Sequence, residues 1–193
     1  MAMNQIEQIE IRWHGRGGQG AVTSANLLAE AAYYAGFKGV TSAPAFGAER
    51  RGAPVTASTR LASAPLRHFS QVEAPDMVII LEGSLLTTAN ATEGLAPNGH
   101  VIVNTRLAPE ELGLSNGYQV ATVDADRIAE EINLRAAGVI MVNTAMLGAV
   151  ARATELITLD HINRTLRHAF SPKAAEKNIE AARLTFEATR CAS

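Results

Sequence analysis

The residues best suited to do chemistry stand in one short stretch, Gly15-Arg16-Gly17-Gly18-Gln19-Gly20. Gly15, Gly17 and Gly20 match the pattern G-x-G-x-x-G, between a run that favours a strand and a run that favours a helix. Glycine allows backbone angles and close approaches that a side chain would block. A helix N-terminus offers free N–H groups and partial positive charge to an anion. The stretch therefore predicts a site for a phosphorylated ligand.

Cationic side chains accompany this turn. Arg16 and Gln19 add a guanidinium and an amide donor to it, and a second loop, Phe46-Gly47-Ala48-Glu49-Arg50-Arg51-Gly52-Ala53-Pro54, carries paired arginines that could clamp phosphates. Residues 1–70 hold seven Lys/Arg against four acids, a net +3, whereas the remainder holds ten against fifteen, a net −5. The predicted ligand-binding residues are Gly15, Arg16, Gly17, Gly18, Gln19, Gly20, Arg50 and Arg51.

The motif alone leaves the ligand open. NAD binding calls for an acid about 20 residues further on, at the end of the second strand, but residues 39–43 contain none. An NADP site could use Arg50 or Arg51, and a P-loop is excluded because no Gly-Lys-Ser/Thr follows the glycines. A tight connection without a ligand and a solvated or interface-facing arginine pair both remain open.

The sequence shows no group of residues with the spacing of a known catalytic site or of a set of metal ligands. His14, just before the glycines, could touch a phosphate or serve as a structural histidine, and His161 and His168 do not have the i,i+4 spacing of a helical metal pair. Cys191 is the only cysteine, so an internal disulfide and a zinc or iron–sulfur site built on cysteines of this chain are excluded. We therefore nominate no catalytic residue and no metal ligand.

The surrounding elements are predicted from periodicity and caps. Strands are expected at residues 6–13, 39–43, 55–62, 77–81, 100–104 and 118–123, and helices at 21–35, 84–95, 125–134, 137–151, 158–169 and from 172 onward. Strands alternating with helices indicate an α/β fold, a single layered domain over residues 1–193 with a mainly parallel sheet and a Rossmann-like glycine-rich first turn. A net charge of −2 gives no sign of nucleic-acid binding, and the lack of a leader or a membrane-spanning run predicts a cytoplasmic protein.

Four segments together resemble one family, the gamma subunit of 2-oxoacid:ferredoxin (acceptor) oxidoreductases. They are the glycine stretch 15–20, the loop 46–54, the strand Met77-Val78-Ile79-Ile80-Leu81-Glu82 and the terminal Lys173-Ala174-Ala175-Glu176-Lys177-Asn178. Arg16 and the Glu-Arg-Arg-Gly-Ala-Pro loop look more like the pyruvate and the branched-chain or aryl 2-oxoacid branches than the 2-oxoglutarate branch.

The resemblance implies a subunit that positions coenzyme A while a 2-oxoacid is oxidatively decarboxylated to an acyl-CoA. Thiamine diphosphate and iron–sulfur clusters would lie on partner alpha, beta and ferredoxin-like delta subunits, with ferredoxin or another protein as electron acceptor. The glycine turn, Arg50 and Arg51 would receive the coenzyme A phosphates. Two alternatives stay open here: a stand-alone NADP-dependent oxidoreductase and a purely structural subunit.

Overall fold

A seven-stranded mixed sheet forms the centre of the molecule in the computed structural model, which describes residues 7–44, 51–66, 72–114, 117–136 and 138–192. The strands follow the order β2-β3-β1-β4-β5-β6-β9. The strands are β1 (Gln8–Arg16), β2 (Gly39–Pro44), β3 (Pro54–Ala62), β4 (Met77–Ile80), β5 (His100–Asn104), β6 (Gln119–Val123) and β9 (Arg190–Cys191), with a separate hairpin of β7 (Arg135–Ala136) and β8 (Val139–Ile140).

Only the middle of the sheet is parallel. β1, β4, β5 and β6 run in one direction, whereas β3 lies antiparallel between β1 and β2, and β9 lies antiparallel beside β6. The prediction of an α/β fold is confirmed, but a mainly parallel sheet is found only in this core. In a Rossmann fold the second strand of the chain pairs with the first; here β3 separates the two, because β2 and β3 form an antiparallel pair that docks through β3.

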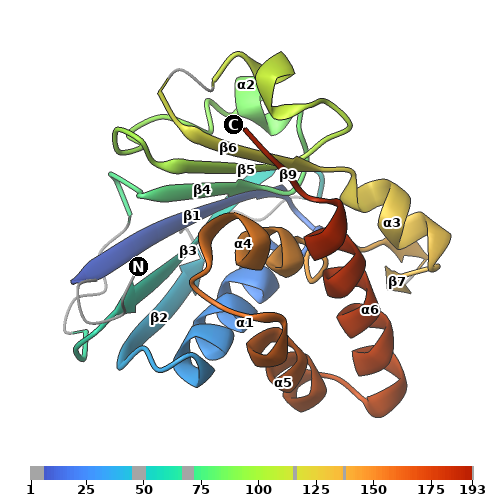
Figure 1. Ribbon diagram of the computed structural model, residues 1–193. Coiled ribbons are helices and arrows are strands. Elements are labelled where there is room, and N and C mark those ends of the chain that lie inside the picture. The colour runs from blue at the N-terminus through green and yellow to red at the C-terminus, as the bar shows by residue number, and fades with distance from the viewer. Residues whose placement is uncertain (1–6, 45–50, 67–71, 115–116, 137, 193) are drawn as a thin grey trace.

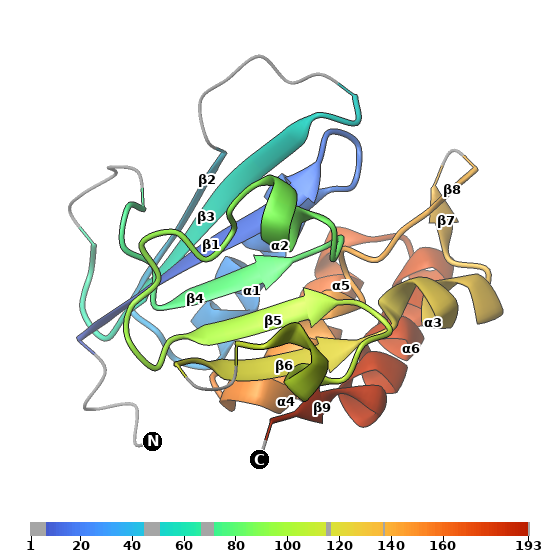
Figure 2. The same ribbon diagram turned by 90° about the horizontal axis from the view of Figure 1, so that it is seen from above.

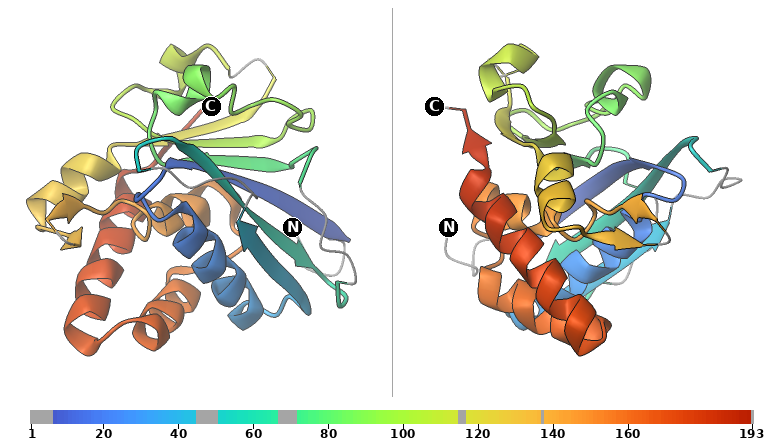
Figure 3. Two further views of the ribbon diagram at one scale, coloured as in Figure 1. Left: turned by 180° about the vertical axis from the view of Figure 1, so that it is seen from behind. Right: turned by 90° about the vertical axis from the view of Figure 1, so that its right-hand side faces the viewer.

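Helices cover the two faces of the sheet unequally (Figures 1 and 3). The helices are α1 (Ala21–Tyr34), α2 (Leu85–Thr88), the 3₁₀ helix η2 (Pro109–Leu112), α3 (Ala125–Glu131), α4 (Met146–Thr154), α5 (Leu159–Ala169) and α6 (Pro172–Ala188). The larger apolar core lies between the sheet and α1, α3, α4, α5 and α6. A smaller cluster fills the other face beneath α2 and η2, around Val78, Ile80 and Val101.

Local sequence explains most element boundaries. Asp124 caps α3 by accepting a hydrogen bond from the N–H of Arg127 at 3.0 Å, Thr158 caps α5, and Pro172 occupies the first turn of α6. The strands predicted at 39–43, 55–62, 77–81, 100–104 and 118–123 and the helices predicted at 21–35, 125–134, 158–169 and from 172 are confirmed within a few residues.

Two predicted helices are wrong in part. The helix expected at 84–95 closes after a single turn, Leu85–Thr88, because Asn90 and Gly94 adopt positive φ. The helix expected at 137–151 begins only at Met146, because Gly138, at φ +81°, turns the chain between β7 and β8. Val139 and Ile140 are β-branched residues that fit a strand as well as a buried helix. For this reason the apolar sequence did not distinguish the β7–β8 hairpin from the start of a helix.

The carboxyl ends of the parallel strands gather at one edge of the sheet (Figure 2). The arrowheads of β4 and β5 point toward the side of the molecule from which the β7–β8 hairpin projects. The turn between β1 and α1 lies at this same edge, which is where ligands bind in open α/β sheets. No helix among the described residues has the length and apolarity needed to cross a bilayer.

Candidate functional site

The glycine-rich turn is shorter than the sequence suggests. β1 continues through Gly15 and Arg16, so the turn itself consists of Gly17 to Gly20. Gly18 and Gly20 adopt φ of +95° and +80°, which glycine tolerates and larger residues rarely adopt. Gly20 is the N-cap of α1, whose first turn contains no acidic residue and receives no side-chain cap. The helix therefore presents its N-terminal N–H groups without a competing negative charge.

The second predicted motif lies beside this turn. The N–H of Gly17 donates to the carbonyl of Ala53 at 2.9 Å, and the N–H of Gly52 donates to the carbonyl of Gly17 at 3.0 Å. Arg51 is exposed next to Gly17. A Cβ placed on Gly18 or Gly52 would meet nothing within 4 Å, so the space above both glycines is open. Arg50 and residues 46–49 lie outside the described residues.

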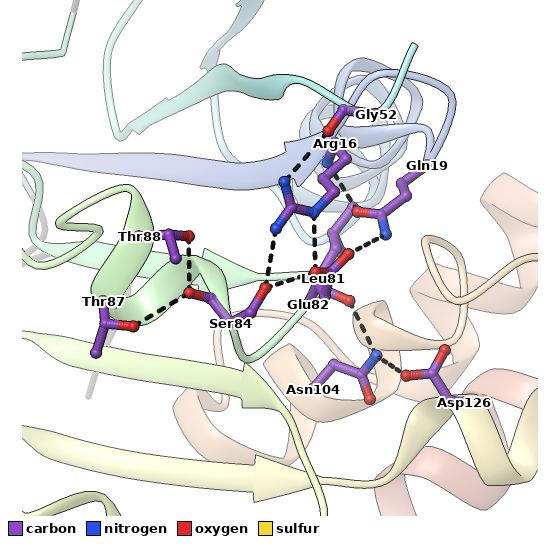
Figure 4. A network of polar contacts seen from close by, with 10 residues as sticks. All are labelled: Arg16, Gln19, Gly52, Leu81, Glu82, Ser84, Thr87, Thr88, Asn104 and Asp126. Carbon is purple, nitrogen blue, oxygen red and sulfur yellow. Dashed lines mark hydrogen bonds and ion pairs between the residues drawn. The ribbon is translucent and has the colours of Figure 1, made fainter.

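Glu82, just beyond β4, organises the turn (Figure 4). Its Oε1 lies 2.8 Å from Nε of Arg16, and its Oε2 accepts from Nε2 of Gln19 at 2.9 Å. The same guanidinium donates to the carbonyl of Gly52 at 3.2 Å and to Oγ of Ser84 at 3.0 Å. Arg16 thus joins the end of β1 to the segments before β3 and after β4, and Arg16 and Gln19 are already engaged by protein groups.

The charge state of Glu82 follows from these bonds. Burial alone would raise the pKa of Glu82, but hydrogen bonds from Ser84, Arg16 and Gln19 outweigh burial and lower the pKa below its usual value. The carboxylate is therefore ionised at neutral pH and balances the charge of Arg16. Glu82 is a site residue outside the predicted set, although it closes one of the four segments that resemble the family. An acidic side chain directly after a buried apolar strand is the sequence signal that marks it.

The polar network extends to the neighbouring strands through Asn104. Its Nδ2 donates to the carbonyl of Leu81 at 2.9 Å and to Oδ2 of Asp126 at 2.8 Å, and its Oδ1 accepts from the N–H of Ala125 at 2.9 Å. Burial raises the pKa of Asp126, and the bond from Asn104 offsets part of that rise. Asn104 therefore holds the ends of β4 and β6 in register with β5 and stiffens the edge that carries Glu82.

His14 has a structural role on the other face of the sheet. The residue is 4 % exposed, and Nε2 of its imidazole accepts from Nε of Arg12 at 3.1 Å. Arg12 also donates to the carbonyls of Ala91 and Glu93, which ties β1 to the segment after α2. Burial, with a smaller effect from the charge of Arg12, lowers the pKa of His14 to about 4. The imidazole is neutral at physiological pH and sits among protein partners.

Comparisons with known proteins agree on one family. Residues 10–188 match the family described as pyruvate ferredoxin/flavodoxin oxidoreductase. The chain is 49 % identical over 185 residues to the pyruvate/ketoisovalerate oxidoreductases common subunit gamma of Pyrococcus abyssi, covering 94 % of this chain and 97 % of the relative.

Solved structures give the same result. The pyruvate oxidoreductase subunit PORC of Thermotoga maritima superposes with a TM-score of 0.80 at 36 % identity and covers 97 % of this chain and 99 % of its own. The 2-oxoglutarate:ferredoxin oxidoreductase of Magnetococcus marinus, with 2-oxoglutarate, coenzyme A and succinyl-CoA bound, shares the fold. Its TM-score is 0.68 at 19 % identity, over 94 % of this chain and 31 % of that one. The chain belongs to the pyruvate ferredoxin/flavodoxin oxidoreductase family, as a counterpart of its gamma subunits.

Proposed function

We propose that this chain holds coenzyme A for a multisubunit 2-oxoacid:ferredoxin oxidoreductase that acts on pyruvate or a branched-chain or aryl 2-oxoacid. The observation that carries the proposal is the uncapped N-terminus of α1, open above Gly18 and Gly52 and flanked by the exposed Arg51. Helix N–H groups and a guanidinium are complementary to a phosphate group. Relatives named for pyruvate and ketoisovalerate support the choice of 2-oxoacid. The coenzyme A bound in the Magnetococcus enzyme supports the choice of ligand.

Within this proposal Gly15 lies inside β1, where a Cβ would stand 3.2 Å from the side chains of Ala21 and Leu81, and the other predicted residues of the turn and Arg51 divide into two groups. Gly17, Gly18, Gly20 and Arg51 would face the phosphates, whereas Arg16 and Gln19 would hold the turn in place through Glu82. The proposal extends to Arg50 on its position in the sequence beside Arg51. The Arg16–Glu82 pair keeps the site from carrying an uncompensated carboxylate, which would repel an anion.

The proposed contribution of this chain is placement of the thiol. In the overall reaction the bond between the carboxylate and the 2-oxo carbon breaks and carbon dioxide leaves. The acyl carbon loses an electron pair to the acceptor and bonds to the coenzyme A sulfur, whose proton is released. Thiamine diphosphate and iron–sulfur clusters, which we assign to partner subunits, would supply the chemistry of decarboxylation and electron transfer. Holding the thiol in a reactive geometry lowers the barrier without a catalytic side chain in this chain.

The stand-alone NADP alternative has less support. A dinucleotide site uses the end of a second parallel strand directly beside the glycine turn to recognise the ribose. Here β3 lies between β1 and β2 and runs antiparallel to both. The purely structural alternative makes a different prediction. If this chain does not bind coenzyme A, substitutions at the glycine turn or at Arg51 leave the KM for coenzyme A unchanged.

The test uses the assembled complex, purified through a tag on this chain and checked for iron and thiamine diphosphate. In Arg51→Ala, the KM for coenzyme A should rise about tenfold, because a charge-assisted contact contributes roughly 1.5–3 kcal/mol. The KM for the 2-oxoacid should stay as it is. Arg167→Ala, which removes an exposed arginine from α5, is the control. An Arg51→Ala complex with the coenzyme A affinity of the control would overturn this assignment of Arg51, and recovery of the chain without iron and thiamine partners would overturn the proposed complex.

A further inference from the structure

Asn143 lies against the glycine turn although it is distant in sequence. It precedes α4, and the residue is only 4 % exposed. A Cβ built on Gly20 would stand 2.7 Å from Nδ2 of Asn143 and 3.0 Å from its Cγ. The missing side chain of Gly20 therefore makes room for this amide, which reaches the N-cap position of α1.

The backbone around Asn143 is firmly held. Oγ of Ser24, on the first turn of α1, donates to the carbonyl of Asn143 at 3.1 Å and to the carbonyl of Gly20 at 3.1 Å. The next residue, Thr144, donates from Oγ1 to Oδ1 of Asn178 on α6 at 2.5 Å. The backbone at Asn143 and Thr144 is thus held between α1 and α6.

The amide itself has no hydrogen-bond partner among the described residues. The two other buried asparagines in the described part of the chain differ in this respect. Both polar atoms of Asn104 are bonded, to Leu81, Asp126 and Ala125. Both polar atoms of Asn178 are bonded as well, to Thr144 and Ala174. The fully enclosed side-chain polar atoms without a partner in the described residues are Oγ1 of Thr122 and Oγ1 of Thr165. The unpaired amide of Asn143 is not among them, so it still reaches solvent and can bond a group bound beside the N-terminus of α1.

We infer that Asn143 is a further ligand-binding residue, whose amide donates to a phosphate oxygen of coenzyme A held at the N-terminus of α1. The inference rests on the proposed function and adds to it a donor from a third segment, beside the glycine turn and the arginine loop. A neutral donor suits this position. It gives the phosphate one more hydrogen bond beside those from the helix N–H groups, and it needs no counter-charge of its own.

The decisive variant is Asn143→Asp, measured in the assembled complex. It preserves the size of the side chain but replaces the donor by a carboxylate, which repels a phosphate. A carboxylate beside a helix N-terminus is itself favourable, so a loss of coenzyme A binding with unchanged or higher thermal stability would not come from a damaged fold. Asn143→Ala separates the loss of the donor from the repulsion by the new charge. Asn26→Asp is the control, because it introduces the same charge at an exposed position of α1, away from the N-terminus of that helix.

Two measurements test the inference. The first is the KM for coenzyme A, compared with the KM for the 2-oxoacid. The second is direct binding of coenzyme A, detected as the shift that it causes in the unfolding temperature of the complex. We expect Asn143→Asp to weaken coenzyme A binding at least tenfold by both readouts, with the 2-oxoacid KM as in Asn26→Asp. Asn143→Ala, a second variant that removes the donor without adding charge, should weaken binding about tenfold.

Asn143 variants that bind coenzyme A as tightly as Asn26→Asp would overturn the inference. If Arg51→Ala still weakens binding in that case, only the role of Asn143 fails. If Arg51→Ala and both Asn143 variants all retain the affinity of their controls, the proposed coenzyme A site at the turn fails as well.

Discussion

Gly148 of α4 packs directly against the backbone of Ala182 of α6: a Cβ at Gly148 would overlap the Ala182 carbonyl oxygen and approach the N–H of Phe186 within 2.9 Å. Both neighbours are backbone atoms, so no side-chain rotation relieves the overlap. This close helix crossing fixes the start of α4, and with it Asn143 and Thr144, against the part of α6 that carries Asn178.

Gly148→Ala should therefore destabilise the protein despite improving helix propensity. Alanine is favoured over glycine in a helix by about 1 kcal/mol, whereas forcing a methyl group into a packed contact costs roughly 1–3 kcal/mol or more. We expect a lower free energy of unfolding for Gly148→Ala than for wild type, measured by urea unfolding of the isolated chain. Gly117→Ala, where a Cβ would meet nothing within 4 Å, is the control. Equal stability of Gly148→Ala and wild type would show that α4 and α6 can separate freely.

Glu82→Ala should loosen the glycine turn. The substitution removes the acceptor of Arg16, Gln19 and Ser84 and leaves the guanidinium without its carboxylate. Because hydrogen bonds to a charged group contribute roughly 1.5–3 kcal/mol and the pair is partly exposed, we expect a loss of about 1–2 kcal/mol in the free energy of unfolding.

Glu131→Ala provides the comparison for Glu82→Ala, since it removes an exposed carboxylate that pairs with Arg127. A surface pair of this kind contributes little, so its removal should change stability by at most about 0.5 kcal/mol. If the two variants unfold alike, Glu82 does not organise the turn.

His14 should make the protein sensitive to mild acid. Its pKa falls from 6.5 to about 4 on folding, so the unfolded chain takes up a proton at a higher pH than the folded chain. The stabilising effect of keeping His14 neutral is complete above about pH 6.5 and is lost as the pH falls toward 4. A difference of this size corresponds to about 3 kcal/mol.

His14→Gln removes this titration while preserving an acceptor for Arg12. The free energy of unfolding, measured between pH 7 and pH 4, should therefore fall less steeply in His14→Gln than in wild type. His161→Gln is the control, because glutamine suits the same position of the α5 capping box. Parallel pH profiles for wild type and His14→Gln would show that His14 protonates without cost in the folded state.

The sequence by itself determined most of the strands and helices, the side-chain caps of α3 and α5, the proline at the start of α6, and two segments of the site, the glycine stretch and the arginine loop. These features depend on local patterns: apolar periodicity, capping side chains and the positions of glycine and proline. The glycine stretch and the arginine loop, about 30 residues apart, were predicted to share a ligand, and the backbone bonds between Gly17 and the segment 52–53 bring them side by side.

Only the tertiary structure decided how the site is assembled. Strand order depends on which sheet edges pair, so nothing local foretold that β3 separates β1 from β2. Glu82 and Asn143 acquire their places from contacts across 66 and 119 residues, which no spacing rule encodes. The hairpin at 135–140 was likewise decided by the turn at Gly138, because β-branched apolar residues fit both a strand and a buried helix.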